Sequence, residues 1–485
     1  MSATRVVTRF APSPTGYMHI GNLRTALYAY LLARHHGGTF ILRIEDTDRQ
    51  RLVADATKVI LDTLRITGLS YDEGPGVGGP HGPYVQSERL DIYRRYALEL
   101  IEKGAAYYCF CAKERQEEPE PGEALGGGYD RHCRYLSKEE VEARLAAGMP
   151  YVIRQKMPLD GTTVFYDEVF GEIATENKEL QDQVLLKADG YPTYNFCHVV
   201  DDYLMGVTHV LRGTEYLTST PKYALLYDSF GWPRPHYVHL PLMMGRNGDG
   251  SVSKLSKRHG SVSFADLLAD GFLPQAILNY IALLGWCPKD SQTEFYSLAE
   301  LAELFTVDGI SKSPSVFDFD KLLWFNGEYI RRLPFPEFAQ AIKPFLRTPL
   351  PDFVDLDRAL ALLHGRLDKL SLIDEKMAFF VQVPPYETAL FCNKKNKVTE
   401  EQARGYLAAA LPVLEGLTEW EGAALYQAMT ELAARLDCKP AALLWCLRIA
   451  VSGLLVTPGG ATEIMAVIGR DESLLRVRAA LDKLS

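Results

Sequence analysis

The sequence predicts an α/β body followed by an all-helical C-terminal region. An apolar run at residues 6–10, helical spacing at 21–34 and a second apolar run at 39–44 together predict strand, helix, strand, the opening of a parallel α/β sheet. Strand-like patterns return from residue 151 onward, which indicates that the α/β body continues there. After Ser263 these patterns disappear and helical spacing takes over.

The remaining elements follow from local periodicity. Alternation predicts strands within 151–167 and 183–202, and 207–211 resembles a buried strand. Residues 114–128 are rich in charge, Pro and Gly, and we expect them to form an inserted loop. The further predicted helices are 55–64, 87–103, 220–230, 264–270, 274–284, 298–305, 320–329, 400–411, 421–436, 440–451 and 472–484.

Two of the C-terminal helices carry end signals. Pro440 suits the first turn of its helix because its missing amide proton is not needed there. Asp471 is the expected N-cap of the last helix. We expect the helical region to form about two subdomains.

Length and composition favour a multidomain protein of the cytoplasm. The 485 residues exceed what one hydrophobic core usually supports, and 47% of them are apolar. No apolar run approaches the roughly 18 residues that span a bilayer, and residues 1–10 lack the order of a signal peptide. The eight cysteines form no dense framework, which favours reduced thiols over disulfides.

The charge distribution neither supports nor excludes RNA binding. The net charge of −10 argues against indiscriminate binding of nucleic acid, since phosphate affinity comes from Lys and Arg. From residue 331 to 485, however, 19 basic residues balance 19 acidic ones, so the first 330 residues carry the whole excess with 33 basic and 43 acidic residues. Any polyanion must therefore be met by local patches.

The segment from Arg9 to Asn22 joins the first predicted strand to the first predicted helix, where open α/β sheets bind ligands. The helix N-terminus offers free amides and a positive dipole to phosphate. Gly16 and Gly21 allow close approach of the backbone to a nucleotide, and His19 can donate a hydrogen bond to a phosphate oxygen. The alternative is a turn and a helix with a structural histidine, which is the more common role of a lone histidine. Here the prolines, the glycines and His19 occur together in one segment, and phosphate binding accounts for all of them.

A second segment comprises Lys254, Leu255, Ser256, Lys257 and Arg258. Two lysines three residues apart on a mobile loop can close on a triphosphate and offset the charge of the departing pyrophosphate. The alternative for this segment alone is a solvated basic loop. Its position after the second half of the α/β pattern, together with the first segment, favours phosphate chemistry.

Residues 12–21 and 254–258 resemble the two signature sequences of the class I aminoacyl-tRNA synthetases, in the form found in the glutamyl and glutaminyl branch. The sequence departs from the wider class at Asn22, which replaces histidine, and at Leu255 and Arg258, which replace methionine and serine. Both variants are frequent in this branch, so they leave open only the individual role of Asn22. The other segments that match this branch are 43–48, 82–89, 189–194 and 199–202.

The resemblance, which runs over nearly the full length, implies a Rossmann-type catalytic domain with an inserted acceptor-binding subdomain and a helical anticodon-binding region. The implied domains are the first half of the Rossmann domain at 1–104, the inserted subdomain with a zinc site at 105–188, the second half with the lysine loop at 189–262, a helical stem-contact domain at 263–330 and a two-part anticodon-binding domain at 331–485.

The resemblance also implies an activity and a set of partners. The implied enzyme is a bacterial-type glutamate–tRNA ligase that uses ATP with Mg²⁺ to form glutamyl-adenylate from L-glutamate. It then transfers the glutamate to the 3′ end of tRNA(Glu), and adenylate forms only when the RNA is bound. We expect the enzyme to be a monomer that does not associate with membranes.

The resemblance assigns roles that the side chains can support. Arg9 and Arg212 would hold the side-chain carboxylate of glutamate, because a guanidinium pairs with a carboxylate through two bonds, and Glu45 would receive the α-amino group. The alternative for Arg9 and Glu45 is a buried structural ion pair. The implied catalytic residues are His19, Lys254 and Lys257, the other amino-acid contacts are Ala11, Ser13, Tyr194 and His198, and the ATP contacts are Gly16, His19, Gly21, Asn22, Glu215, Lys254, Leu255, Ser256, Lys257 and Arg258.

A cysteine cluster suggests a structural metal. Cys109, Cys111 and Cys133 supply three sulfurs, and some members of the family bind Zn²⁺ here through three cysteines and a tyrosine, a spacing that Tyr129 fits. His132 and Tyr135 lie nearby, so the identity of the fourth ligand stays open. The alternative is three reduced cysteines in an RNA-contacting insertion.

The choice of tRNA depends on the helical region. In discriminating members of the family an arginine reads the third anticodon base, and aligning 363–370 with the family's corresponding helix places Arg366 there. Arginine offers only donors, which suit the acceptor edge of cytosine and not guanine. This favours charging of tRNA(Glu) with discrimination against tRNA(Gln), and the alternatives are a non-discriminating enzyme and a solvated surface arginine.

Other classes of protein fit the sequence less well. A glutaminyl enzyme would be expected to end in β-barrels, and the short relative that modifies a queuosine base lacks an anticodon-binding region. A catalytically silent RNA-binding paralogue would tolerate loss of His19, Lys254 or Lys257, all of which are present. A small-molecule adenylyltransferase would have no use for the long helical tail.

Overall fold

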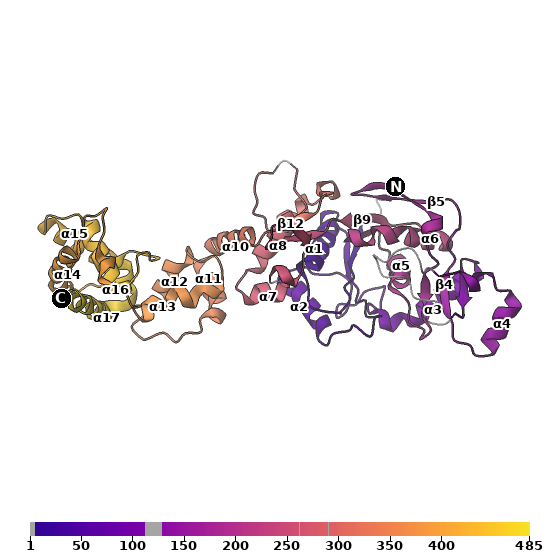
Figure 1. Cartoon of the computed structure of the whole chain (residues 1–485), viewed down its shortest axis with the longest axis horizontal. Helices are drawn as coiled ribbons and strands as arrows, with labels where there is room; N and C mark the ends of the chain where they lie inside the picture. The colour runs from indigo at the N-terminus through magenta and orange to yellow at the C-terminus, as the bar shows by residue number, and fades with distance from the viewer. Residues whose placement is uncertain (1–4, 112–128, 261, 290) are drawn as a thin grey trace. The chain divides into compact units, whose positions relative to one another are not determined.

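A computed structural model describes residues 5–111, 129–260, 262–289 and 291–485. The chain divides into two compact units (Figure 1). Unit 1, called here the catalytic unit, comprises Met1–Leu267 and Ile277–Asp318, and unit 2, the C-terminal unit, comprises Leu268–Ala276 and Phe319–Ser485. The five-domain division drawn from the sequence stays a prediction.

The catalytic unit opens with the predicted strand, helix, strand. β1 (Val7–Phe10) pairs in parallel with β2 (Thr39–Leu42), and α1 (Ile20–His35) connects them. β8 (His209–Gly213) continues the body beside β1, because the Thr208 N–H donates to the Val7 carbonyl over 2.9 Å. The other elements of this body are β5 (Thr162–Asp167), β6 (Gly171–Glu176) and β9 (His236–Leu240), in the sheet order β6-β5-β9-β8, with α2 (Ala56–Thr67), α3 (Leu90–Glu102) and α6 (Thr220–Phe230).

A separate antiparallel sheet is inserted between the two halves of this body. β3 (Ala106–Cys109), β4 (Val152–Gln155) and β7 (Val184–Leu186) form it, with β4 in the centre. The adjoining α4 (Lys138–Ala146), which the sequence analysis missed, is stabilised by a capping box of Ser137 and Glu140. The predicted loop 114–128 lies outside the described residues.

The strand prediction for 183–202 is correct only for β7, since Tyr194–Leu204 forms the helix α5. Residues 196–202 of this helix are buried without interruption. A helix that is buried on all sides has no amphipathic stripe, and the paired Val199 and Val200 locally favour a strand. Tertiary packing therefore overrides the local pattern.

The prediction that no strand follows Ser263 is wrong at one element. β12 (Ser315–Phe317) pairs in parallel with β10 (Met243–Arg246), which also forms a hairpin with β11 (Val252–Lys254). A strand of three residues is too short to show a period, and its partner lies far away in the sequence. The predicted helices nearby are confirmed as α7 (Phe264–Ala269), α8 (Pro274–Leu283) and α9 (Leu298–Leu304).

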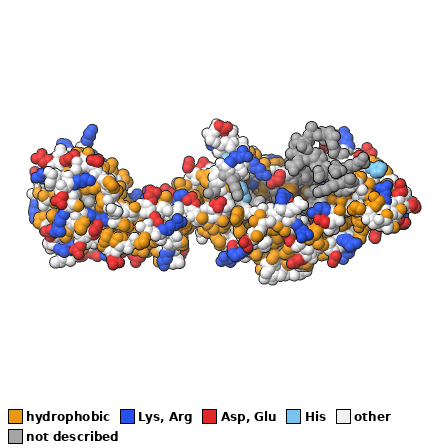
Figure 2. All heavy atoms as spheres, turned by 60° about the horizontal axis from the view of Figure 1, so that its bottom comes forward, with side chains coloured by type: hydrophobic (Ala, Val, Ile, Leu, Met, Phe, Trp, Pro, Cys, Tyr) orange, Lys and Arg blue, Asp and Glu red, His pale blue; other side chains and the backbone are white. Residues whose placement is uncertain are grey.

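The C-terminal unit is built from helices, as the sequence predicts, and its buried side chains form one apolar cluster. Figure 2 shows basic and acidic side chains interspersed on one face of these helices, in agreement with their balanced charge. None of the helices in the described residues combines the length and the apolarity that a membrane span requires. Its longer elements are α10 (Phe319–Arg332), α11 (Phe335–Ile342), α12 (Leu356–His364), α13 (Ile373–Val381), α14 (Glu400–Glu415), α15 (Gly422–Arg435), α16 (Pro440–Ser452) and α17 (Ala461–Lys483).

The two end signals have different outcomes. Pro440 is the first residue of α16, as expected. Asp471 is not an N-cap, because α17 begins at Ala461 and continues across a kink at Gly469, whose φ of 73° favours glycine. Asp471 therefore lies within the helix, in the first turn after the kink.

Candidate active site and metal centre

A cavity of about 510 Å³ opens at the carboxyl ends of β1, β8 and β9. Gly16, His198, Ser256 and Arg258 do not line it, and the side chain of Lys257 lies outside the described part of the structure. The predicted residues that the fold brings together around this cavity are Arg9, Ala11, Ser13, His19, Gly21, Asn22, Glu45, Tyr194, Arg212, Glu215, Lys254 and Leu255.

His19 is the N-cap of α1. Its Nδ1 accepts a hydrogen bond from the Gly21 N–H over 3.1 Å, so a neutral ring must carry its proton on Nε2. Burial, followed by the nearby charge of Lys254, lowers the pKa of His19 below its ordinary value. The ring is therefore neutral at neutral pH and has an N–H donor to offer.

Three buried arginines and three buried acids form one cluster at the cavity, and two of them, Arg9 and Glu45, line it. Arg9 Nε lies 3.0 Å from Asp202 Oδ1, and the fully buried Arg43 binds Asp202 over 2.8 Å and Glu45 over 3.0 Å. Burial raises the pKa of Glu45 to about 7, although Arg43 and Arg9 act to lower it. Arg9 and Glu45 therefore both take part in buried ion pairs, but each pairs with another residue, Arg9 with Asp202 and Glu45 with Arg43.

The remaining pairs of this cluster involve Asp201. Its carboxylate lies 2.8 Å from Arg89 Nε and accepts a hydrogen bond of 2.8 Å from the Tyr93 hydroxyl. The sequence analysis matched the segments that contain Arg43, Arg89, Asp201 and Asp202 but gave these residues no role. For Asp201 and Asp202 the available signal was two adjacent acids directly after the apolar Val199 and Val200.

Arg212, on β8, has one guanidinium nitrogen to spare. Its Nε donates to His239 Nε2 over 3.1 Å and its Nη2 donates to Thr220 Oγ1 over 2.8 Å, whereas Nη1 is buried without a hydrogen-bond partner. His239 is held in turn by Asp167, whose Oδ2 lies 2.7 Å from Nδ1. A buried donor without a partner is costly, so Nη1 needs an acceptor such as a ligand carboxylate.

His198 lies next to this arginine among aromatic rings. Its ring packs 4.8 Å from that of Tyr194 and 4.4 Å from that of Tyr223, and both ring nitrogens are buried without a hydrogen-bond partner. Burial, followed by the charge of Arg212, holds the pKa of His198 well below its ordinary value. A neutral imidazole there can donate to a bound ligand.

The lysine loop, residues 254–258, begins at the last residue of β11. Lys254 Nζ lies 3.8 Å from Glu215 Oε1, so the acid expected at adenosine pairs here with a signature lysine. Leu255 is buried and its N–H donates to the Met243 carbonyl over 2.9 Å. Arg258 is exposed, and its Nε donates to Ser256 Oγ over 3.2 Å.

A second cavity of about 1070 Å³ adjoins the first, because Ser13, Glu45, Tyr194 and Tyr216 line both. It lies between the inserted sheet and the rest of the catalytic unit. Its basic side chains are Arg49, Arg51 and Lys187, its aromatic ones are Phe110, Tyr151, Tyr194 and Tyr216, and its acidic ones are Glu45, Asp48 and Asp189. Such a lining suits a strand of nucleic acid, whose phosphates seek cations and whose bases stack on rings.

The cysteine cluster has the composition of a metal centre. The sulfurs of Cys109, Cys111 and Cys133 lie within 4.8 Å of one another, and those of Cys111 and Cys133 are 3.5 Å apart. The Phe110 N–H donates to Cys133 Sγ over 3.3 Å. The Tyr129 hydroxyl is buried without a hydrogen-bond partner.

Tyr129 is the best-placed fourth ligand among the three considered. The Arg154 guanidinium lies 3.9 Å from the centre of its ring, although burial raises the pKa of the Tyr129 hydroxyl when no metal is bound. His132 and Tyr135 are both exposed. Three sulfurs with a buried oxygen match the donor set of a structural Zn²⁺ site, so these residues fit the metal.

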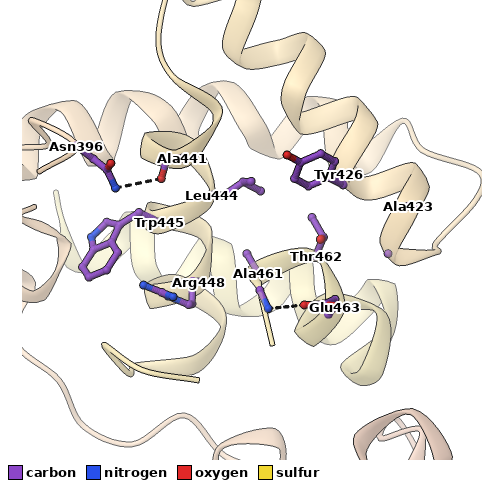
Figure 3. A pocket seen from close by; sticks show the side chains of 12 residues that line it. Asn396, Ala423, Tyr426, Ala441, Leu444, Trp445, Arg448, Ala461, Thr462 and Glu463 are labelled. Atoms are coloured by element: carbon purple, nitrogen blue, oxygen red, sulfur yellow. Dashed lines mark hydrogen bonds between the residues drawn. The ribbon is translucent and has the colours of Figure 1, made fainter. Parts of the chain in front are cut away.

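The C-terminal unit has a pocket of its own, of about 680 Å³, which the sequence analysis missed (Figure 3). The rings of Trp445 and Tyr426 line it, and the Arg448 guanidinium lies 4.7 Å from the centre of the Trp445 ring. Asn396 and Thr462 add polar groups. An aromatic face beside donors and acceptors suits a planar, hydrogen-bonding ligand.

Arg366 is exposed and lies in the turn after α12, which ends at His364. Its expected place on a helix is therefore wrong. Gly365 stands at the C-cap, and the Arg366 N–H donates to the Leu363 carbonyl over 2.8 Å.

Comparisons with known proteins agree with this arrangement. The model of the family "tRNA synthetases class I (E and Q), catalytic domain" matches residues 5–324, and that of "Anticodon binding domain" matches residues 337–481. The chain is 52% identical to the glutamate–tRNA ligase of Clostridium tetani over 487 residues, which cover 100% of this chain and 99% of the relative. The enzyme of the same name from Clostridium botulinum strain Hall is 52% identical over 483 residues, 99% of each chain.

Solved structures give the same result. A crystal structure of a glutamate tRNA ligase from Elizabethkingia meningosepticum in complex with its amino acid is 33% identical, with a TM-score of 0.88 over 99% of this chain and 100% of that one. The glutamate-tRNA synthetase of Elizabethkingia anophelis is also 33% identical, with a TM-score of 0.87 over the same shares.

Proposed function

The chain belongs to the class I tRNA synthetases of the glutamate and glutamine branch, and we propose how its residues divide the work of glutamate–tRNA ligation. In this reaction the α-carboxylate of glutamate attacks the α-phosphate of ATP, which gives glutamyl-adenylate and pyrophosphate. A ribose hydroxyl of the tRNA then attacks the activated carbonyl. No protein nucleophile is required, so catalysis rests on positioning and on charge stabilisation.

The observation that carries the proposal is the unpartnered Nη1 of Arg212 in a cavity that also holds Arg9 and Glu45. The side-chain carboxylate of glutamate supplies the acceptor that Nη1 lacks, with the neutral ring of His198 as a second donor. Glutamine offers no negative charge there and is disfavoured. Glu45 receives the α-ammonium group, whose charge favours the ionised carboxylate.

The phosphates of ATP lie between the two signature segments in this proposal. The N-terminus of α1 and the Nε2–H of His19 serve the α-phosphate, and Lys254 exchanges its contact with Glu215 for the triphosphate. The released Glu215 is then available to adenosine. The second cavity receives the 3′ end of the tRNA next to the adenylate.

Pyrophosphate exchange tests the activity directly. Exchange that depends on glutamate and on tRNA(Glu) supports the ligase and its requirement for RNA. A protein that binds tRNA(Glu) but shows no exchange and no charging would be the silent paralogue instead.

We propose that Cys109, Cys111, Cys133 and Tyr129 hold one structural Zn²⁺, which orders the insertion. The expected result is one zinc per chain by elemental analysis after expression with zinc. Cys133→Ser should lower this content, because it removes a thiolate ligand. Cys287→Ser is the matched control, since Cys287 is exposed and free.

Zinc-free protein after metal-replete expression would reject the site. Tyr129→Phe separates the fourth ligand from the other three, because it removes only the buried hydroxyl. If Tyr129→Phe retains zinc as tightly as the wild type, the fourth ligand is another group.

For the C-terminal unit, we propose that the pocket of Trp445 and Arg448 receives an unpaired base of the anticodon. The ring supplies a stacking face, and Arg448 Nε is buried without a hydrogen-bond partner. Arg366, which stands exposed beyond α12, is assigned to the third anticodon base, where its donors suit cytosine and reject guanine.

The discrimination that follows is expected to appear when purified tRNA(Glu) and tRNA(Gln) are charged side by side. The wild type should glutamylate tRNA(Glu) strongly in preference to tRNA(Gln). Arg366→Gln should narrow this preference, whereas Trp445→Ala should weaken charging of tRNA(Glu) through the loss of stacking. Comparable charging of both RNAs by the wild type would refute discrimination. An unchanged preference in Arg366→Gln would show that Arg366 does not read the third anticodon base.

A further inference from the structure

One histidine that has no role in the proposed chemistry, His259, connects the lysine loop, residues 254–258, to the β10–β11 hairpin by hydrogen bonds. His259 ends the short helix η6 (Lys257–His259), directly after the loop. Its Nδ1 lies 3.1 Å from the Ser256 N–H, inside the loop, and its Nε2 lies 2.9 Å from Asn247 Oδ1, at the end of β10. The ring therefore bridges the loop and the hairpin.

The hydrogen bonds of the hairpin turn determine which nitrogen of His259 carries the proton. Ser251 Oγ donates to Asp249 over 2.6 Å, which leaves it an acceptor for the Asn247 Nδ2–H at 2.8 Å. Asn247 Oδ1 thus faces His259, and because it can only accept, Nε2 must be the donor. In the neutral ring, Nδ1 then accepts from the Ser256 N–H.

The hairpin is shaped to receive this ring. A Cβ on Gly245 would lie 2.6 Å from His259 Cγ, so no other residue at this position leaves the ring in place. Gly245 pairs with Ser253 in the β10–β11 ladder and its φ is unremarkable, so close approach of the ring is what requires a glycine. By contrast, a Cβ on Gly248, in the turn of the same hairpin, meets nothing within 4 Å.

We propose that His259 is a positioning residue that holds the lysine loop in the conformation which presents Lys254 to the triphosphate. It acts through the Ser256 amide and touches no substrate. The inference rests on the proposed role of the lysine loop in activation.

The consequence for rate follows from the small number of anchors. At its start the loop is anchored by Lys254, which pairs with Met244 in the β10–β11 ladder and lies 3.8 Å from Glu215, and by the Leu255 N–H, which donates to the Met243 carbonyl. Beyond Leu255, the described contacts of the loop are that of Ser256 with His259 and that of Arg258 with Ser256, within the loop itself. Without the imidazole, the loop samples conformers in which Lys254 misses the phosphates. His259→Ala is expected to lower kcat for pyrophosphate exchange by roughly 10- to 100-fold, with the melting temperature close to that of the wild type.

Matched variants separate positioning from a general structural role. His259→Asn keeps an acceptor near the position of Nδ1 and is expected to recover most of the exchange rate, whereas His259→Gln, which reaches toward Asn247 instead, is not. Gly245→Ala should lower kcat as His259→Ala does, because its methyl group displaces the ring. Gly248→Ala should leave the rate unchanged.

A double-mutant cycle gives the decisive measurement. Because the methyl group in Gly245→Ala acts on the ring, it should add little once His259 is already alanine. Additive losses in the double variant, or wild-type exchange in His259→Ala, would overturn the inference. Lys254→Ala is run in parallel: if it too leaves exchange unchanged, the proposed role of the loop fails, whereas a loss in Lys254→Ala alone rejects only the role of His259.

Discussion

Arg212→Ala is expected to lower kcat/KM for glutamate by roughly a hundredfold, equivalent to about 3 kcal/mol. Two of its three guanidinium nitrogens are held by His239 and Thr220, which aims the third, Nη1, into a buried place without an acceptor. The substrate carboxylate must make a charge-assisted bond there, and alanine removes it. Steady-state charging of tRNA(Glu) over a range of glutamate concentrations measures the loss.

The matched variant for this prediction is Arg9→Ala. Arg9 shares the buried Asp202 with Arg43, so its removal leaves that carboxylate with one arginine partner instead of two and should lower the melting temperature as well as glutamate use. Arg212 makes no such ion pair among the described contacts, and Arg212→Ala should affect catalysis with less effect on stability. Wild-type kcat and KM for glutamate in Arg212→Ala would place the pocket elsewhere.

Contiguous motifs were the most predictable part of the site. His19 and Gly21 lie where the loop after β1 enters α1, and both the strand and the helix are predictable from local periodicity. Their place at the cavity therefore follows from the general geometry of parallel sheets. The same holds for Lys254 and Leu255. Local periodicity also predicted the helices confirmed as α10, α14, α15 and α16, whereas α11, α12 and α13 were not predicted individually.

The remainder depends on contacts between distant residues. Asp167 and His239 support Arg212 from two other strands, and no local motif marks them. The helix α5 carries Asp201 and Asp202 into the core, where only the arginines of other segments make them tolerable. Likewise, the need for glycine at position 245 follows only from the contact with the ring of His259, which the sequence does not show.

His19→Ala and Lys257→Ala are each expected to lower glutamate activation by roughly a hundredfold or more, while the affinity for tRNA changes little. For His19 the reason lies in its two nitrogens. Nδ1 is occupied as the N-cap acceptor of α1, and the lowered pKa keeps the ring neutral, so Nε2 presents an N–H to the charge that develops on the phosphate. Pyrophosphate exchange measures activation, and filter binding measures the affinity for tRNA.

Because His19 also caps α1, an alanine variant alone would confound catalysis with helix stability, and His19→Asn resolves the two. Asparagine is a strong N-cap whose side-chain oxygen can take the Gly21 N–H, but its amide N–H groups lie closer to the backbone and do not reach the position of the Nε2–H. We therefore expect His19→Asn to melt at the wild-type temperature and yet to activate glutamate as poorly as His19→Ala. If His19→Asn instead restores the exchange rate, the histidine serves only the helix, and the stabilisation of the phosphate belongs to the lysines and the backbone amides of α1.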